Sequence, residues 1–123
     1  MRIIIDTHIF LWALAAPERL DPGKKSELQS LANTIYVSSI SIAEIMMKVS
    51  LGKLEFSADP IAATEEAGFH PLDFSAADAV LLKELPFHHR DPFDRMLISQ
   101  SIAQKTKLMS DDSKFVLYDC DLV

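Results

Sequence analysis

The sequence predicts an α/β fold in which a central parallel sheet of four to five strands is flanked by helices. Short β-branched runs alternate with helix-like stretches along the whole chain, which is typical of parallel sheets. Residues 2–6 are a short β-branched run, three isoleucines in a row, that ends in an acid, as expected for a parallel strand that is buried on both faces. A length of 123 residues is that of one ordinary domain, so we expect residues 1–123 to form a single domain.

The first strand, at residues 2–6, is followed by two helices. The apolar stretch 9–15 stands just before a proline, which predicts a short helix that ends there. The Asp-Pro pair at 21–22 is an N-cap followed by a first-turn residue, so a polar helix is expected over 23–32. Leu28 and Leu31 mark the side of this helix that is expected to be buried.

The next two elements are a strand and a longer helix. The β-branched and aromatic run 34–38 predicts the second strand. Ser41 stands three residues before Glu44, which is the spacing of a capping box, and an apolar helix follows until Gly52. The residues that are most simply explained as core are Trp12, Met46 and Met47.

The second half of the chain repeats the alternation. The Asp-Pro pair at 59–60 predicts a short helix, residues 69–74 predict a strand, and Ser75 is expected to cap another helix. Residues 86–90 are expected to form a loop.

The C-terminal part contains the clearest helix of the sequence. The Asp-Pro pair at 91–92 opens it, and Lys105 and Lys107 stand at its end, where positive charge is favoured. Residues 107–110 predict a short strand, and residues 118–123 are expected to add a last one.

Composition excludes several classes of protein. No apolar run approaches the roughly 20 residues that a membrane-spanning helix needs, so we expect no membrane association. A single cysteine, Cys120, cannot form an internal disulfide, which favours a cytoplasmic protein. A formal charge of −6 has the wrong sign for a protein that binds nucleic acid through a broad basic face.

Acidic residues gather where ligand sites form in parallel sheets, beyond the carboxyl ends of the strands. Four separate segments are expected to bring acids to this edge, namely Asp6, Glu44, the pair Asp91 and Asp94, and the pair Asp111 and Asp112. Each group has a simpler explanation. Glu44 fits a capping box, Asp91 fits an N-cap, Asp94 is favoured by the helix dipole, and the last two acids fit a turn.

Taken together, these acids indicate a metal site. Two carboxylates about 4 Å apart repel each other by up to about 4 kcal/mol, so a cluster of them needs a cation or protons. Oxygen ligands suit Mg²⁺ or Mn²⁺, which also bind substrate phosphate oxygens. Such an ion would let an acidic protein bind a phosphodiester and would activate a water molecule.

Basic and histidine side chains near the acids are candidates for contacting substrate. Arg90 and Arg95 flank the acids of the long helix and are the better candidates for binding phosphate. The adjacent pair His88 and His89 lacks the spacing of a zinc site, so we favour phosphate contacts or ordering of the loop. His8 is expected to be structural, and Lys48, four residues after Glu44, is first an ion-pair partner of that acid.

At these residues the sequence resembles the PIN-domain proteins, specifically the VapC-type toxin ribonucleases of type II toxin–antitoxin pairs. The resemblance covers nearly the whole chain. The segments that show it are Ile5–His8, Ser41–Ile45 with Lys48, Leu51–Leu54, Leu85–Arg95 and Met109–Phe115. The run His-His-Arg-Asp-Pro-Phe-Asp-Arg is the most specific of them.

The resemblance implies a three-layer PIN-like fold, a set of site residues and a set of partners. It makes Asp6, Glu44, Asp94 and Asp112 the catalytic and metal-binding acids, with Asp91 as an additional metal candidate. Asp112 is chosen over Asp111 because it keeps the spacing to Phe115. Ser110, Arg90, Arg95 and His88 are the expected substrate contacts. The family also implies Mg²⁺ or Mn²⁺, an RNA substrate, a cognate antitoxin protein and a homodimer.

The leading hypothesis is therefore a metal-dependent endoribonuclease, with one or two cations orienting a water molecule for attack on RNA. A catalytically silent PIN-fold scaffold that binds a partner is the alternative, although a scaffold has no need of mutually repelling acids. A third hypothesis is phosphotransfer through Asp6, but the second acid that some such enzymes have two residues later is replaced here by His8.

Overall fold

The computed structural model describes residues 1–123 and confirms the predicted α/β fold. Its sheet has the order β3-β2-β1-β4, and every strand pair is parallel. The strands are β1 (Arg2–Ile5), β2 (Thr34–Ser38), β3 (His70–Leu72) and β4 (Lys107–Met109). The helices are α1 (Thr7–Ala15), α2 (Pro22–Gln29), α3 (Ser39–Ser50), α4 (Pro60–Glu66), α5 (Ala76–Val80) and α6 (Pro92–Ala103), with 3₁₀ helices η1 (Pro17–Arg19), η2 (Leu81–Glu84) and η3 (Ser113–Leu117).

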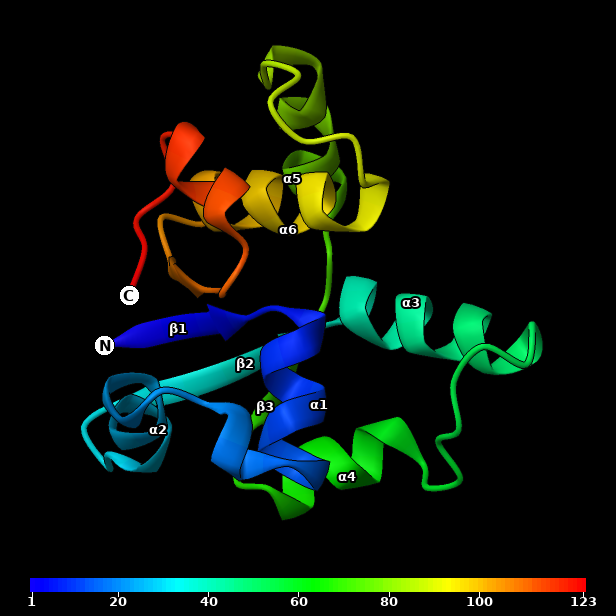
Figure 1. The fold of residues 1–123 in the computed structure, drawn as a ribbon. Helices are drawn as coiled ribbons and strands as arrows, with labels where there is room; N and C mark the ends of the chain where they lie inside the picture. Colours follow the sequence, from blue (N-terminus) through cyan, green and yellow to red (C-terminus); the bar gives the residue numbers. More distant parts are fainter.

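The molecule has three layers, with the sheet in the middle. Figure 1 shows α5 and α6 on one side of the sheet and α1, α2 and α4 on the other. Strand β1 supplies the core of both sides, because its successive side chains point to opposite faces. Ile3 and Ile5 belong to the core shared with α1, whereas Ile4 belongs to the core shared with α6. All three side chains are fully buried, as the continuous apolar run predicts.

The predicted helix starts are confirmed wherever an Asp-Pro pair occurs. Asp21, Asp59 and Asp91 are each an N-cap whose side chain accepts backbone N–H groups of the first turn. Ser75 caps α5 in a capping box with Asp78. These caps fix where each helix begins and thus where its first-turn acids lie.

The start of α3 differs from the expectation. The helix begins at Ser39, and its N-cap is Ser38, whose Oγ accepts the N–H of Ile40. The capping box of Ser41 with Glu44 is therefore wrong, because β2 continues into α3 without a loop. Both side chains instead lie one turn further into the helix and are buried, which leaves Glu44 free for another role.

Three apolar side chains that the sequence pattern predicts to be buried are exposed. Helix α2 ends at Gln29, two residues before Leu31, which is fully exposed in the following turn. Met46 and Met47 are also exposed, because α3 presents Ile45 to the core and turns this part of its surface away. Helical spacing gives the period of a buried face but does not say how wide that face is.

The C-terminal elements are shorter than expected. Helix α6 ends at Ala103, and Lys105 adopts a positive φ of 50° in the turn that leads to β4. The predicted last strand at 118–123 is reduced to one bridge between Leu122 and Leu108. No helix combines the length and the apolar character that a membrane crossing requires.

Candidate metal centre

Three carboxylates meet at the carboxyl edge of the sheet. Asp6 follows β1 and is the N-cap of α1, where its Oδ1 accepts the N–H of Ile9 at 2.8 Å. Asp112 follows β4 and is the N-cap of η3. Asp94 lies in the first turn of α6. Since β1 and β4 are parallel neighbours, their ends bring Asp6 and Asp112 to the same edge, as predicted.

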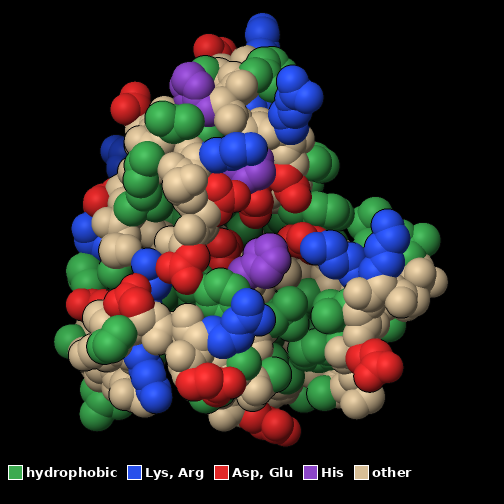
Figure 2. Space-filling view, in the orientation of Figure 1, with side chains coloured by type: hydrophobic (Ala, Val, Ile, Leu, Met, Phe, Trp, Pro, Cys, Tyr) green, Lys and Arg blue, Asp and Glu red, His purple; other side chains and the backbone are tan.

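A hollow of about 290 Å³ opens between these segments. Its lining consists of Asp6, His8, Trp12, Asp94, Asp111 and Asp112. In Figure 2, acidic side chains gather around the middle of the face shown, and Lys and Arg side chains lie around their margin. The hollow is thus a concave acidic site with basic side chains around it. The acids could bind a cation, and the cation and the basic side chains together could bind an anion.

The electrostatics of Asp94 show that the hollow holds an excess of negative charge. The pKa of Asp94 is raised to about 7, first by burial and then by the charge of Asp91, against the opposing effect of His89. The charges of Asp6 and Glu44 also raise it. Asp94 therefore ionises readily only when the negative charge of the neighbouring acids is neutralised, by protonation of those acids or by a bound cation.

Two further acids of the hollow, Asp6 and Asp112, have different environments. Burial raises the pKa of Asp6, although hydrogen bonds from Ser110 and from the N–H of Ile9 oppose the shift. Burial acts in the same direction on Asp112, but hydrogen bonds from Lys114 N–H and His89 outweigh it and lower the pKa of Asp112. The site therefore contains both readily ionised and reluctant carboxyl groups.

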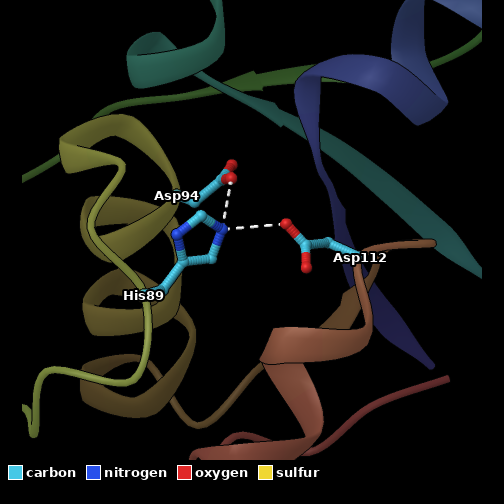
Figure 3. A group of neighbouring side chains, drawn as sticks. All are labelled: His89, Asp94 and Asp112. Atoms are coloured by element: carbon cyan, nitrogen blue, oxygen red, sulfur yellow. Dashed lines mark hydrogen bonds and ion pairs between the residues drawn. The ribbon is translucent and has the colours of Figure 1, made fainter.

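His89, expected with His88 to contact phosphate or order the loop, instead lies between two acids of the site. Its Nε2 lies 2.9 Å from Asp94 Oδ2 and 2.8 Å from Asp112 Oδ2, and Figure 3 shows the ring between the two carboxylates. One ligand atom from each of the three residues lies within 4.8 Å of the other two. The ring is buried, contrary to the usual exposure of loop histidines. No local signal in the sequence marks this position, because the ring is held by Tyr118 and Phe115, which come much later in the chain.

Glu44 lies beside the hollow and is already engaged. Its Oε1 accepts from Thr7 Oγ1 at 2.7 Å, and its Oε2 pairs with Lys48 Nζ at 2.8 Å, which confirms the predicted ion pair with Lys48. The carboxylate is buried and does not line the hollow. It nevertheless acts on the site, because its charge raises the pKa of Asp94.

The two acids of uncertain role have definite partners. Asp91 Oδ1 accepts the N–H groups of Phe93 and Asp94, so this carboxylate caps α6. Asp111 Oδ1 pairs with Lys24 Nζ at 2.8 Å, which ties α2 to the segment after β4. Asp112 rather than Asp111 is the acid that joins Asp94 and His89.

The expected substrate contacts occupy three kinds of position. Arg90 and His88 are exposed in the loop before α6, and the His88 ring packs edge-on against Tyr118. Ser110 is half-buried beside Asp6, and its Oγ accepts the N–H of Asp112 at 3.0 Å. Arg95 is turned toward its own loop, where its donors reach the carbonyl oxygens of residues 85, 86 and 89.

His8 and Trp12 complete the wall of the hollow. Their rings lie 6.1 Å apart, and the guanidinium of Arg19 lies 4.8 Å from the Trp12 ring centroid. His8 does not cap the first helix, since Asp6 has that role. Trp12, expected in the core, is only half-buried: it packs against the core and also lines the hollow.

The donor set of the hollow fits a hard divalent cation. Carboxylate oxygens of Asp6, Asp94 and Asp112 face one space, and the nearby charges that raise the pKa of Asp94 are the charges that a cation would offset. No thiol takes part, because the single cysteine, Cys120, does not line the hollow and its Sγ contacts Phe115 O. Oxygen-rich sites of this composition favour Mg²⁺ or Mn²⁺ over softer ions.

Several solved structures have the same fold. A chain of VapBC2 from Rickettsia felis, bound to a DNA fragment from the promoter, matches with a TM-score of 0.70 and 23% identity over 100% of this chain and 98% of that one. A chain of DNA-bound VapBC from Salmonella typhimurium matches with a TM-score of 0.66 and 12% identity, over 100% of this chain and 97% of that one. A chain of VapBC-5 from Mycobacterium tuberculosis, a member of the VapBC family of toxin-antitoxin systems, matches with a TM-score of 0.58 and 17% identity, over 99% of this chain and 95% of that one. At these identities the likeness establishes the fold.

The comparison with protein families is more specific. No curated protein matches this chain. The family model described as PIN domain matches residues 3–119, a range that includes β2, β3, β4, all of β1 except Arg2, and every acid of the hollow. The parallel four-stranded sheet and its acidic carboxyl edge agree with this match, and the chain belongs to the PIN domain family.

Proposed function

We propose that this protein is a metal-dependent endoribonuclease that hydrolyses phosphodiester bonds of RNA in the cytoplasm, with Mg²⁺ or Mn²⁺ as its cofactor. The proposal rests on one observation, the acidic hollow in which burial and neighbouring acids raise the pKa of Asp94 to about 7. A divalent cation offsets this excess of negative charge and attracts a phosphate group to a protein whose formal charge is −6.

The carboxylates have distinct roles in this proposal. Asp6, Asp94 and Asp112 face the hollow and would hold the ion, and Glu44 adds the fourth negative charge from its buried position. The bound ion supplies Lewis-acid polarisation of the phosphate and lowers the pKa of its water. Asp91 caps α6 and so sets the position of Asp94. In this role it contributes to the site without contacting the ion.

The surroundings of the hollow supply the contacts to RNA. Arg90 and His88 are exposed in the loop before α6 and are free to meet phosphate oxygens. Ser110 lies beside Asp6, within reach of a substrate at the ion. Arg95 takes part indirectly, because its donors hold the loop that presents Arg90.

We further propose that the protein is the toxin of a type II toxin–antitoxin pair, and that it forms a homodimer and is inhibited by a cognate antitoxin. Support comes from membership of the PIN domain family and from the fold shared with VapBC structures of three bacteria. The sequence motif around Asp91 and Asp94, which resembles VapC-type proteins, adds to that support.

Two other functions are less well supported. A silent PIN-fold scaffold does not account for buried acids that raise one another's pKa values. Phosphotransfer through Asp6 is less well supported, because one of its oxygens is engaged with the N–H of Ile9 and the second acid of some such enzymes is replaced by His8. The acidic hollow favours hydrolysis at a metal ion over both.

The test is cleavage of a panel that includes transfer and ribosomal RNA, using wild-type protein and Asp94→Asn with Mg²⁺ or Mn²⁺, each with and without a chelator. We expect cleavage by the wild type with metal, and loss of cleavage with chelator or in Asp94→Asn. Folding of the variant is checked by circular dichroism. Equal cleavage by folded Asp94→Asn would refute the proposal, and absence of both cleavage and Mn²⁺ binding in the wild type would favour the scaffold.

A further inference from the structure

His89 makes contacts through both of its ring nitrogens. Nε2 faces Asp94 Oδ2 at 2.9 Å and Asp112 Oδ2 at 2.8 Å (Figure 3). On the other side of the ring, Nδ1 accepts the backbone N–H of Asp91 at 3.1 Å. The contact at Nδ1 determines whether Nε2 carries a proton, because a neutral imidazole has a single N–H, on one or the other of the two nitrogens.

The N–H of Asp91 assigns the tautomer of His89. A nitrogen that accepts a hydrogen bond must present its lone pair, so Nδ1 carries no proton in this arrangement. A doubly protonated ring would place two N–H groups face to face. The single ring proton is therefore on Nε2, which donates it to Asp112 Oδ2 and also lies 2.9 Å from Asp94 Oδ2.

We propose that His89 is a positioning residue of the acidic centre, which donates from Nε2 to Asp112, keeps Asp94 beside the same nitrogen, and is not itself a metal ligand. The inference rests on the proposed function and assigns this residue a role within it. Nε2 offers no lone pair to an ion while it carries the proton. To ligate a metal, the proton would have to move to Nδ1, which would break the bond from Asp91. Hydrogen bonds to metal-bound carboxylates are known to tune their affinity.

The surrounding structure fixes the donor before any ion binds. The N–H of His89 donates to Tyr118 Oη at 2.8 Å, and the ring lies edge-on to Phe115 with centroids 5.9 Å apart. Arg95 donates to the carbonyl oxygens of Pro86 and His89 at 2.9 and 3.4 Å. A buried ring held from its backbone, its edge and its second nitrogen can impose a fixed separation on the two acids that it joins.

The tautomer is tested by ¹⁵N NMR of the imidazole groups in metal-free protein and in protein with saturating Mg²⁺. His89→Gln identifies the signals of His89 among those of the four histidines. We expect a protonated Nε2 and an unprotonated Nδ1 in both states. A proton on Nδ1 with Mg²⁺ bound, or on both nitrogens without it, would overturn the inference.

Matched variants test the role by Mn²⁺ binding, measured by electron paramagnetic resonance. His89→Gln keeps an amide donor near the position of Nε2, whereas His89→Leu removes it. We expect His89→Gln to bind Mn²⁺ within about threefold of the wild type, and His89→Leu to bind about 10- to 100-fold more weakly. Equal weakening in both variants would contradict the proposal. If His89→Leu fails to fold, His89→Asn replaces it, since its shorter side chain cannot reach both acids.

These measurements separate this inference from the proposed function. If Mn²⁺ binding follows the expected order but no RNA is cut, the nuclease proposal fails while the role of His89 is supported. If RNA is cut in a metal-dependent way and His89→Gln behaves like His89→Leu, the nuclease proposal is supported and the role of His89 as a donor is refuted. A wild type that binds no Mn²⁺ refutes both.

Discussion

The hydroxyl of Thr7 donates a hydrogen bond of 2.7 Å to Glu44 Oε1, although the two residues are 37 positions apart in the sequence. Thr7 is the first residue of α1, and Glu44 lies in the second turn of α3, so the bond joins the helices that follow β1 and β2. The Thr7 oxygen also lies 2.9 Å from Ser41 Oγ. Since Thr7 has one hydroxyl proton and gives it to the carboxylate, Ser41 donates back to Thr7.

Thr7→Val should destabilise the protein. Valine has a similar shape but cannot donate, so the buried carboxylate of Glu44 would lose one of its two partners. We expect the free energy of unfolding to fall by about 1 to 3 kcal/mol, the usual cost of leaving a buried polar group without its partner. Urea denaturation of the metal-free protein measures the change. Thr7→Ser keeps the hydroxyl and serves as the control, and an equally large loss in that variant would contradict the explanation.

Asp94→Asn should stabilise the metal-free protein at pH 8. Because the folded-state pKa of Asp94 is raised from 3.8 to about 7, mainly by burial, folding favours its protonated form. The stability that this gives is present in full below pH 3.8 and is lost as the pH rises to about 7. At pH 8 we expect Asp94→Asn to exceed the wild type by on the order of 1 to 3 kcal/mol, since one pKa unit corresponds to about 1.4 kcal/mol.

The measurement is thermal unfolding of both proteins from pH 4 to pH 8 in the presence of a chelator. The gap between them should widen as the pH rises. Asp6, whose pKa is also raised by burial, contributes a loss of the same sign in both proteins. This loss is smaller in Asp94→Asn, because the charge that interacts with Asp6 is gone, and the difference adds to the widening of the gap. Asp112 has a lowered pKa and acts in the opposite sense, so its contribution is lost as the pH falls. A gap that is constant across the range would contradict the assignment.

Much of the fold could be predicted because its signals are local. An Asp-Pro pair can cap and open a helix without help from distant residues, and the continuous apolar run of β1 predicts burial on both faces. The start of α3 could not be predicted in this way. Ser38 and Ser41 are both acceptable caps by type, and only the pairing of β2 with its neighbours decides where the strand ends and the helix begins.

The candidate site was predictable to a similar degree. Acids that follow parallel strands meet at one edge by topology alone, which explains why Asp6 and Asp112 lie together. His89 was not predictable, because its burial depends on Tyr118 and Phe115, which lie more than twenty residues later in the chain. The role of Arg95 could not be read from the sequence either, since its spacing suits a phosphate contact and a loop contact equally well.

Asp91→Asn should leave Mn²⁺ binding nearly unchanged. The Asp91 side chain accepts two backbone N–H groups through Oδ1, and asparagine retains an oxygen that can do the same. Asp91→Ala should lower the free energy of unfolding by about 1 kcal/mol, as expected for a lost N-cap. Calorimetric Mn²⁺ titration and urea denaturation measure the two effects. If Asp91→Asn abolished Mn²⁺ binding while the protein stayed folded, Asp91 would be a ligand as well as a cap.

Asp111→Asn and Asp112→Asn should differ in their effect on RNA cleavage, although the two residues are adjacent. Asp112 joins Asp94 through His89, whereas Asp111 pairs with Lys24 on α2. We expect Asp112→Asn to lower the cleavage rate by at least about 100-fold, because it removes a charge from the ion site. Asp111→Asn should lower it by less than about 10-fold. Initial rates at saturating Mg²⁺ give the comparison, and the reverse order would reassign the fourth acid to Asp111.

Arg95→Ala should loosen the loop before α6. The Arg95 guanidinium lies 4.2 Å from the Phe87 ring centroid and donates to three loop carbonyl oxygens, so its removal takes these contacts with α6 away from residues 85–89. We expect faster amide hydrogen exchange across these residues, measured by mass spectrometry, with little change in β1 or β4. Arg95→Lys restores the charge but not the planar fork of donors, so it should only partly restore protection.

The same variant distinguishes the two roles considered for Arg95. If the guanidinium holds the loop, Arg95→Ala should weaken Mn²⁺ binding in the absence of RNA, because His89 and through it Asp94 would lose their fixed positions. If Arg95 instead contacts phosphate, the variant should raise the KM for RNA while Mn²⁺ affinity and amide exchange stay at wild-type values. Arg90→Ala is the matched control, since Arg90 is exposed and its removal should affect RNA binding alone.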